Sequence, residues 1–344
     1  MKIESNKQLK DYNTFGIQAE ADYFAEVTSL DDLDELMESI VYRQNKKLIL
    51  GGGSNILLKG SFNGLIIKNS ILGISVESEN ETSVIVTANA GEEWDNLILY
   101  CNENKYAGIE NLSLIPGSVG AAPMQNIGAY GVEIKDVFYK LEAVDMESGS
   151  LVRFNLKDCK FGYRESIFKQ ALKGKYFITS VSFKLAKLSS DKTIYAFKTE
   201  YGDLKNTLNE MQVFNLTLKA VSDAVCKIRR SKLPNPKELG NAGSFFKNPT
   251  ISKDQYEKLV LTYPVIPCYP QKNDMVKIPA GWLIEQCGWK GKVVGNTGSH
   301  HSQALVLVNY GNATGQEIWD LAMQIQLSVK EKFGIEILPE VNVF

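Results

Sequence analysis

Apolar residues recur along this chain with two periods, one typical of helices and one typical of strands. From Ser29 to Lys46 they stand three or four residues apart, which predicts one helix with Ser29 as its N-cap and an acidic first turn. The apolar run "KLIL" comes next and predicts a buried strand, and the glycine turn "GGGSN" follows it directly. Ligands of α/β sheets commonly bind where a strand ends, so this turn is a candidate binding position, although such a sequence is also typical of an ordinary turn.

The remaining pattern alternates between predicted strands and predicted helices. Strands are predicted at "GLIIK", "SVIVTANAG", "VFYKLEAVDM", "SLVRFNL", "YFITSVSFKL", "QALVLVN" and "IEILPEV", and helices at "EEWDNLILYCNEN", "TLKAVSDAVCKIRRSK" and "AGWLIEQCG". A long last helix begins at Thr314, where Glu317 completes a capping box, and ends at Gly334. The pattern predicts an α+β protein with a domain boundary near residues 205–225.

Composition excludes several classes of function. The 344 residues carry a formal net charge of -2, whereas a nucleic-acid-binding protein usually has a basic excess. No apolar run approaches the ~18 residues of a membrane span, and the first residues lack the apolar core of a signal peptide. The five cysteines form no CxxC pair, so neither a metal site nor a disulfide framework is predicted, and a cytoplasmic location is expected. The two histidines are adjacent, so proton transfer elsewhere must use other groups.

A second glycine-rich segment, "NLSLIPGSVGAAPMQNIGAYGVE", spans residues 111–133 and carries a single charge. Neither this segment nor "GGGSN" matches the GxGxxG or GxxxxGK[ST] patterns of common nucleotide sites. Exposed main-chain N–H groups in such a loop can bind a pyrophosphate. A close-packed crossing of two backbones explains the same composition. The residues alone leave both interpretations open.

Eight motifs, taken in order, resemble the UDP-N-acetylenolpyruvoylglucosamine reductase family. They are "LGGGSN", "GIENLSLIPGSVGAAPMQNIGAYGVE", "FGYRESIFK", "TEYGDL", "KLPNPK", "GNAGSFFKNP", "AGWLIEQCGWKG" and "QALVLVN". The resemblance extends from "NTFGI" at residue 13 to "LPEV" at residue 338, which is nearly the whole chain. Within this family, the chain resembles the structural type that has a tyrosine-bearing loop, here represented by Tyr201 in "TEYGDL".

The resemblance implies a fold and a domain division. The fold is an FAD-binding module of the vanillyl-alcohol-oxidase (PCMH) type in two subdomains, followed by a C-terminal α+β substrate-binding domain. The implied divisions are residues 1–72 for the first subdomain, completed by 335–344, then 73–216 for the second subdomain and 217–334 for the substrate-binding domain.

The implied activity is the reduction of UDP-N-acetyl-enolpyruvoylglucosamine to UDP-N-acetylmuramate in peptidoglycan precursor synthesis. FAD is the non-covalent cofactor and NADPH the co-substrate, and no protein partner is implied. By resemblance Ser244 is the proton donor, while Arg164 and Glu340 stabilise the enolate. The implied FAD-binding residues are Gly51, Gly52, Gly53, Ser54, Asn55, Pro116, Gly117, Ser118, Gly120, Ala121, Asn126, Gly128, Ala129 and Gly131. The implied substrate-binding residues are Tyr130, Tyr201, Lys232, Asn248 and Gln303.

Each of these residues also has an ordinary interpretation. Ser244 fits a turn, Arg164 beside Glu165 fits a surface ion pair, and Lys232 fits a cation at a helix C-terminus. Two other functions stay open: an FAD-dependent oxidase or dehydrogenase of hydroxy acids or alcohols, and an inactive nucleotide-sugar-binding protein. Many such oxidases attach FAD through histidine or cysteine. Here no histidine precedes residue 300, and neither glycine-rich segment contains cysteine.

Overall fold

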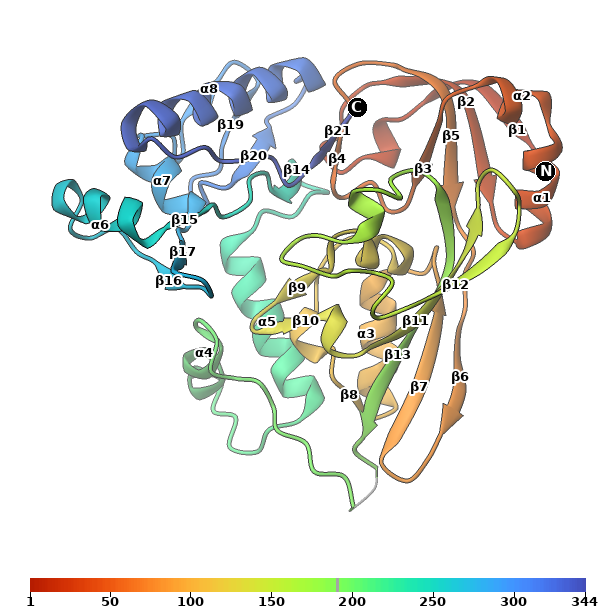
Figure 1. The fold of residues 1–344 in the computed structure, drawn as a ribbon, viewed down its shortest axis with the longest axis horizontal. Helices are drawn as coiled ribbons and strands as arrows, with labels where there is room; N and C mark the ends of the chain where they lie inside the picture. The colour runs from red at the N-terminus through yellow and green to blue at the C-terminus, as the bar shows by residue number, and fades with distance from the viewer. Residues whose placement is uncertain (190–191) are drawn as a thin grey trace. The chain divides into compact units, whose positions relative to one another are not determined.

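The computed structural model describes residues 1–189 and 192–344. The chain divides by compactness into two units, each discontinuous in sequence and each built of helices and strands (Figure 1). The first comprises Met1–Lys7, Ala21–Gly52 and Asn63–Ser231, and the second comprises Gln8–Glu20, Gly53–Phe62 and Lys232–Phe344. None of the helices that the structure describes has the combination of length and hydrophobicity that a membrane span needs.

A four-stranded sheet with the order β1-β2-β5-β3 carries the first glycine turn. Its strands are β1 (Ile3–Gln8), β2 (Glu20–Val27), β3 (Lys47–Leu50) and β5 (Phe62–Asn69). The strands predicted at "KLIL" and "GLIIK" are therefore confirmed, and they pair in parallel. Gly51 follows β3 immediately, so the glycine turn leaves the carboxyl end of a strand as predicted.

The single helix predicted over residues 29–46 is two helices, α1 (Leu30–Glu38) and α2 (Ile40–Gln44). The predicted N-cap Ser29 is confirmed, and it forms a capping box with Asp32 that the sequence analysis did not predict. The prediction of one helix was wrong because Ser39 is extended and its hydroxyl accepts a hydrogen bond from the Tyr42 amide, which starts a new helix. The chain turns there, so Ile40 is 67% exposed although its spacing placed it on the buried face.

A six-stranded antiparallel sheet forms the centre of the first unit, in the order β12-β11-β13-β7-β6, with β8 also paired to β13. Its strands are β6 (Ile74–Glu79), β7 (Ser83–Asn89), β8 (Tyr106–Ala107), β11 (Phe138–Asp145), β12 (Leu151–Asn155) and β13 (Tyr176–Lys187). Helix α3 (Trp94–Glu103) packs on the apolar face, where the rings of Trp94 and Phe183 lie 5.7 Å apart. The predicted strands and helix of this region are confirmed.

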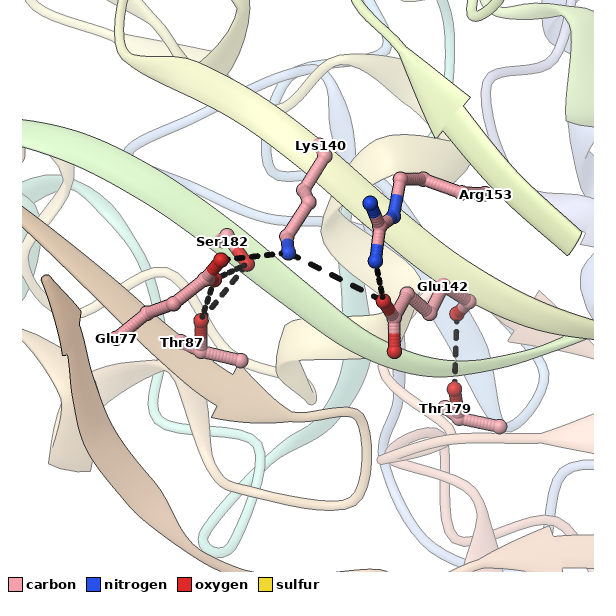
Figure 2. Close-up of polar contacts among 7 residues, drawn as sticks. All are labelled: Glu77, Thr87, Lys140, Glu142, Arg153, Thr179 and Ser182. Atoms are coloured by element: carbon pink, nitrogen blue, oxygen red, sulfur yellow. Dashed lines mark hydrogen bonds and ion pairs between the residues drawn. The ribbon is translucent and has the colours of Figure 1, made fainter. Parts of the chain in front are cut away.

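The opposite face of this sheet carries a polar network that crosses five strands (Figure 2). Lys140 on β11 lies between two carboxylates, with its Nζ 2.7 Å from Glu77 Oε1 and 4.0 Å from Glu142 Oε1. Arg153 on β12 donates to the same Glu142 oxygen at 2.9 Å. Glu77 also accepts from the hydroxyls of Thr87 and Ser182. These contacts join neighbouring strands on the face opposite the apolar cluster that includes α3.

Short elements and two helices complete the first unit. They are β9 (Gly128–Ala129), β10 (Val132–Glu133), α4 (Leu204–Glu210) and α5 (Leu218–Lys232), with 3-10 helices at Glu110–Leu112, Val119–Gln125, Ile134–Asp136 and Ile167–Lys169. The helix predicted near residue 217 is confirmed as α5. By compactness residues 218–231 lie in the first unit, whereas the predicted substrate-binding domain begins at residue 217.

The second unit contains a four-stranded sheet, a three-stranded sheet and three helices. The first sheet has the order β14-β20-β19-β18 and the second the order β15-β17-β16. The strands are β14 (Gly240–Ser244), β15 (Thr250–Ser252), β16 (Tyr269–Pro270), β17 (Met275–Lys277), β18 (Val293–Val294), β19 (Thr297–Ser299) and β20 (Val306–Asn309). The helices are α6 (Lys253–Thr262), α7 (Ala280–Gln286) and α8 (Gly315–Phe333), and a 3-10 helix spans Lys10–Tyr12. The capping box at Thr314 and the end at Gly334 are confirmed for α8.

The strand predicted at "IEILPEV" is not a strand of a sheet. In the part of the chain that the structure describes, this segment makes one isolated bridge, between Pro339 and Phe246. The last strand is β21 (Asn342–Val343), which pairs in parallel with β4 (Ile56–Leu57). The alternation of buried and exposed residues over 335–338 reflects packing of an extended segment rather than ladder hydrogen bonds. The division into three predicted domains stays a prediction.

Candidate functional site

The two glycine-rich segments meet within the first unit. A Cβ atom on Gly52 would lie 2.9 Å from the Cα of Gly117, and a Cβ on Gly51 would overlap the hydroxyl of Ser118. A Cβ on Gly120 would lie 2.5 Å from the Cβ of Ala90. Gly52 and Gly120 are therefore required by the close approach of another backbone, and Gly51 leaves room for the Ser118 hydroxyl. A close crossing is one of the two interpretations that the composition allowed.

One polar group at this crossing fits a bound phosphate. Ser118 is buried, and among the residues that the structure describes its Oγ has no hydrogen-bond partner. A buried hydroxyl usually has a partner, so this one fits a ligand acceptor such as a pyrophosphate oxygen of FAD. The N–H groups of Val119 and Gly120 donate instead to Glu92 and Ala90. Those two amides hold the loop in place.

The end of the glycine-rich segment brings a cation to the backbone. Arg164 donates from its guanidinium to the carbonyl of Gly128 at 2.8 Å. Arg164, Asn126 and Tyr130 all have positive φ, between 45° and 50°. Asn126 adopts this conformation readily, as the C-cap of a 3-10 helix, whereas for Arg164 and Tyr130 it is costly, and such costly residues cluster at functional sites. The Asn126 side chain binds Lys135, Glu133 and Gly162, so it shapes the loop.

Tyr201 and Tyr130 come together beside Gly131. A Cβ atom on Gly131 would lie 3.4 Å from the Cβ of Tyr201, whose side chain is 59% exposed. Tyr130 packs against the apolar cluster of α4 and α5, and this burial raises its pKa. Two predicted substrate-binding residues therefore belong to neighbouring segments of the first unit.

Sequence reasoning missed the residues that anchor the segment carrying Tyr201. The Tyr195 hydroxyl donates to the buried Glu110 carboxylate at 2.5 Å. Asn111 donates from Nδ2 to the carbonyls of Lys198 at 2.7 Å and Tyr130 at 2.9 Å. The sequence feature that could have indicated this role is the position of Glu110 and Asn111, two polar residues at the start of the glycine-rich segment.

The second unit places the segment that follows Ser244 beside the segment that carries Glu340. Residues 245–247 run beside residues 338–340, with the Glu340 amide donating to the Phe245 carbonyl at 2.7 Å and the Lys247 amide donating to the Leu338 carbonyl at 2.9 Å. Ser244 is the last residue of β14, and both Ser244 and Glu340 are half-buried. The sequence separation of nearly a hundred residues hid this proximity from pattern analysis.

The other predicted residues of the second unit have clear structural settings. Asn248 Oδ1 accepts from the first amide of α7, that of Ala280, at 2.9 Å. Gln303 precedes β20 and is half-buried, and Lys232 is exposed at the end of α5. Asn55 accepts from Asn342 through its carbonyl. A Cβ atom on Gly53 would overlap the Tyr12 carbonyl.

The unpartnered Ser118 hydroxyl fits a ligand phosphate, and a family model identifies the class as an FAD-binding protein. A family model described as "FAD binding domain" matches residues 21–155. A second model, "UDP-N-acetylenolpyruvoylglucosamine reductase, C-terminal domain", matches residues 235–344. The α+β fold, with an FAD-binding module and a C-terminal domain, is confirmed.

Relatives over the full length identify the family. UDP-N-acetylenolpyruvoylglucosamine reductase of Flavobacterium johnsoniae is 48% identical over 343 residues, covering 100% of both chains. The enzyme of the same name from Pseudomonas putida is 47% identical over 98% of this chain and 97% of its own. The chain belongs to the UDP-N-acetylenolpyruvoylglucosamine reductase family, and it is an oxidoreductase of peptidoglycan precursor synthesis.

A solved structure supports the fold. The crystal structure of UDP-N-acetylenolpyruvylglucosamine reductase from Thermus caldophilus matches with a TM-score of 0.66 over 100% of this chain and 99% of that one. The two sequences are 21% identical, so this likeness concerns the fold alone.

Proposed function

We propose that the protein uses NADPH and non-covalently bound FAD to reduce UDP-N-acetyl-enolpyruvoylglucosamine to UDP-N-acetylmuramate. The observation that carries this proposal is the pairing of residues 338–340 with 245–247, which brings the two family motifs "LPEV" and "GSFFKNP" to one place. Family membership supports the substrate, and the Ser118 hydroxyl supports the cofactor.

Reduction of an enol ether needs a hydride at one alkene carbon and a proton at the other. FAD, when bound, supplies the hydride. The negative charge that develops on the substrate spreads onto its carboxylate, so a cation and a proton-bearing group nearby stabilise it. Arg164 supplies the cation, held in orientation by its hydrogen bond to the Gly128 carbonyl, and Glu340 supplies the second group. Ser244 donates the proton to the alpha carbon.

The diphosphate of the substrate needs charge-assisted donors. Lys232 supplies an ammonium group, Asn248 an amide and Tyr201 a phenolic hydroxyl. Tyr130 and Gln303 complete the substrate side. The exposed position of Tyr201 beside Gly131 supports its role, because a side chain on the surface can reach a ligand without rearranging the core.

A single assay tests the proposed function against its alternatives. NADPH consumption by the purified protein is expected to begin only when UDP-N-acetyl-enolpyruvoylglucosamine is added. Oxygen-dependent turnover of an alcohol or hydroxy acid would instead establish an oxidase. Binding of the nucleotide sugar without any turnover would establish an inactive binding protein.

A further inference from the structure

Leu114 has a backbone conformation that its side chain disfavours. Its φ is +60°, in the left-handed region, and it stands two residues before Pro116 at the start of the proposed FAD loop. A bulky residue rarely adopts this conformation, because its Cβ crowds the following carbonyl. The surrounding structure must therefore hold it there.

Two charged side chains bind the two main-chain groups of Leu114. Its amide donates to Asp95 Oδ1 at 2.8 Å, and its carbonyl accepts from Arg229 Nε at 3.1 Å. Asp95 lies in the first turn of α3 and Arg229 in the last turn of α5, both in the first unit. Hydrogen bonds to charged groups are stronger than those between neutral groups. The left-handed conformation therefore has a specific support on each side.

The residues around Leu114 are fixed to the same two helices. The indole of Trp94 donates to the Leu112 carbonyl at 3.0 Å, and the Trp94 amide donates to the Gly117 carbonyl at 3.0 Å. The hydroxyls of Ser113 and Ser222 lie 2.7 Å apart. With Leu112 and Gly117 held in this way, the φ of Leu114 decides how the chain between them enters the loop that presents Ser118.

We propose that Asp95 and Arg229 are positioning residues that hold Leu114 in its left-handed conformation and thereby preset the 116–121 loop to bind FAD. This inference rests on the proposed position of FAD at that loop. Neither side chain needs to contact the cofactor, because both act through the main chain of Leu114. Loss of either support lets Leu114 relax, and FAD binding must then restore the conformation at the expense of affinity.

The test measures the dissociation constant of FAD by titrating the apo-protein and following flavin fluorescence. Asp95→Ala is expected to raise this constant about tenfold, the scale of one left-handed non-glycine residue. Asp95→Asn is expected to bind nearly as the unchanged protein does, because its Oδ1 can still accept from the Leu114 amide. Asp95→Ala combined with Leu114→Gly is expected to recover most of the affinity, because glycine adopts positive φ at little cost.

If Asp95→Ala fails to fold, the same FAD titration is made with Arg229→Met, which removes the donor to the Leu114 carbonyl, and with Arg229→Met combined with Leu114→Gly. Asp223→Ala is the matched control, because it removes a carboxylate of α5 whose ion pair is with Lys219, and its FAD affinity is expected to be unchanged. Equal FAD affinity of Asp95→Ala and the unchanged protein would overturn the inference, as would a loss that Leu114→Gly does not recover. Absence of FAD binding by the unchanged protein would overturn the proposed cofactor site itself.

Discussion

Ser244 gives the sharpest test at the scale of single residues. In the proposed mechanism, reduction of FAD by NADPH needs no proton from Ser244, whereas reduction of the substrate does. Ser244→Ala is therefore expected to leave anaerobic flavin bleaching by NADPH nearly unchanged. Reoxidation by substrate is expected to slow by at least ~10²-fold, the usual scale for a lost general acid. Stopped-flow absorbance of the flavin measures both steps separately.

Two outcomes would contradict the role of Ser244. If both half-reactions slow equally, the hydroxyl supports the fold or the cofactor, and if neither slows, the proton comes from elsewhere. Ser244 stands directly before the buried Phe245 at the end of β14, so its substitution could disturb the fold. A misfolded variant would be recognised by its loss of bound flavin.

Tyr201→Phe separates substrate binding from flavin reduction. The phenolic hydroxyl is proposed to hydrogen-bond a charged diphosphate, a contact worth roughly 1.5–3 kcal/mol. We expect the substrate dissociation constant, measured from flavin absorbance on titration, to rise about tenfold to a hundredfold. The rate of flavin reduction by NADPH is expected to stay the same. Tyr139→Phe, on an exposed tyrosine of β11, is the matched control, and an unchanged constant in Tyr201→Phe would exclude the contact.

At this scale the sequence supplies candidate residues but not the positions that they take in the folded chain. Ser244, Arg164 and Glu340 were assigned through family motifs, and only the folded chain brings Glu340 beside Phe245. The Tyr195 contact with Glu110 joins residues 85 positions apart, and no local periodicity encodes such a pair.

Among the elements, the polar network on the six-stranded sheet predicts a dependence of stability on pH. The hydrogen bond from Lys140 is the largest cause that lowers the pKa of Glu77 from its ordinary 4.5. A lowered pKa contributes stability above pH 4.5, and this contribution is lost as the pH falls through the lowered value. Glu77 is partly exposed, so solvent screening limits the effect to less than about 1 kcal/mol.

Glu77→Gln is therefore expected to unfold at lower urea concentration than the unchanged protein at pH 7. The difference is expected to persist down to about pH 5 and to shrink below it, since the carboxylate takes up a proton first in the unfolded chain and, at lower pH, in the folded chain as well. Glu81→Gln, in an exposed pair with Lys192, is the control and is expected to change stability by less than about 0.5 kcal/mol. A difference that grows towards acid pH would show that the network does not stabilise the charged form of Glu77.

Prediction of elements succeeded where the local signal was strong and failed where a single side chain or a distant strand decided the outcome. The N-cap of α1 at Ser29 and the capping box of α8 were predictable because each depends on residues within four positions of one another. The break at Ser39 depends on one hydroxyl competing with the helix. The segment "IEILPEV" has the alternation of a strand, but the residues that pair with β4 are Asn342–Val343, just after this segment. Because β4 lies nearly three hundred residues earlier in the sequence, no local pattern shows which residues pair with it.

For the whole molecule, FAD is expected to be bound without a covalent bond. The two histidines, at positions 300 and 301, lie outside both glycine-rich segments. Burial raises the pKa of four cysteine thiols, those of Cys101, Cys159, Cys226 and Cys287. A thiol with a raised pKa is a poor nucleophile, so covalent attachment through these cysteines is disfavoured. Precipitation with trichloroacetic acid is therefore expected to release all flavin into the supernatant, and flavin that stays with the precipitate would favour the oxidase alternative.

The same non-covalent binding predicts a stability that depends on FAD concentration. A ligand that binds only the folded chain stabilises it by RT ln(1 + [L]/Kd), which is about 2.7 kcal/mol when the ligand is at a hundred times its Kd. For a chain of 344 residues this corresponds to a rise of several degrees in Tm. Scanning calorimetry of the apo-protein at increasing FAD measures the rise, and riboflavin, which lacks the pyrophosphate, is the control. If riboflavin raised Tm as much as FAD does, the pyrophosphate would contribute nothing, and the glycine crossing with its Ser118 hydroxyl would not be the phosphate site.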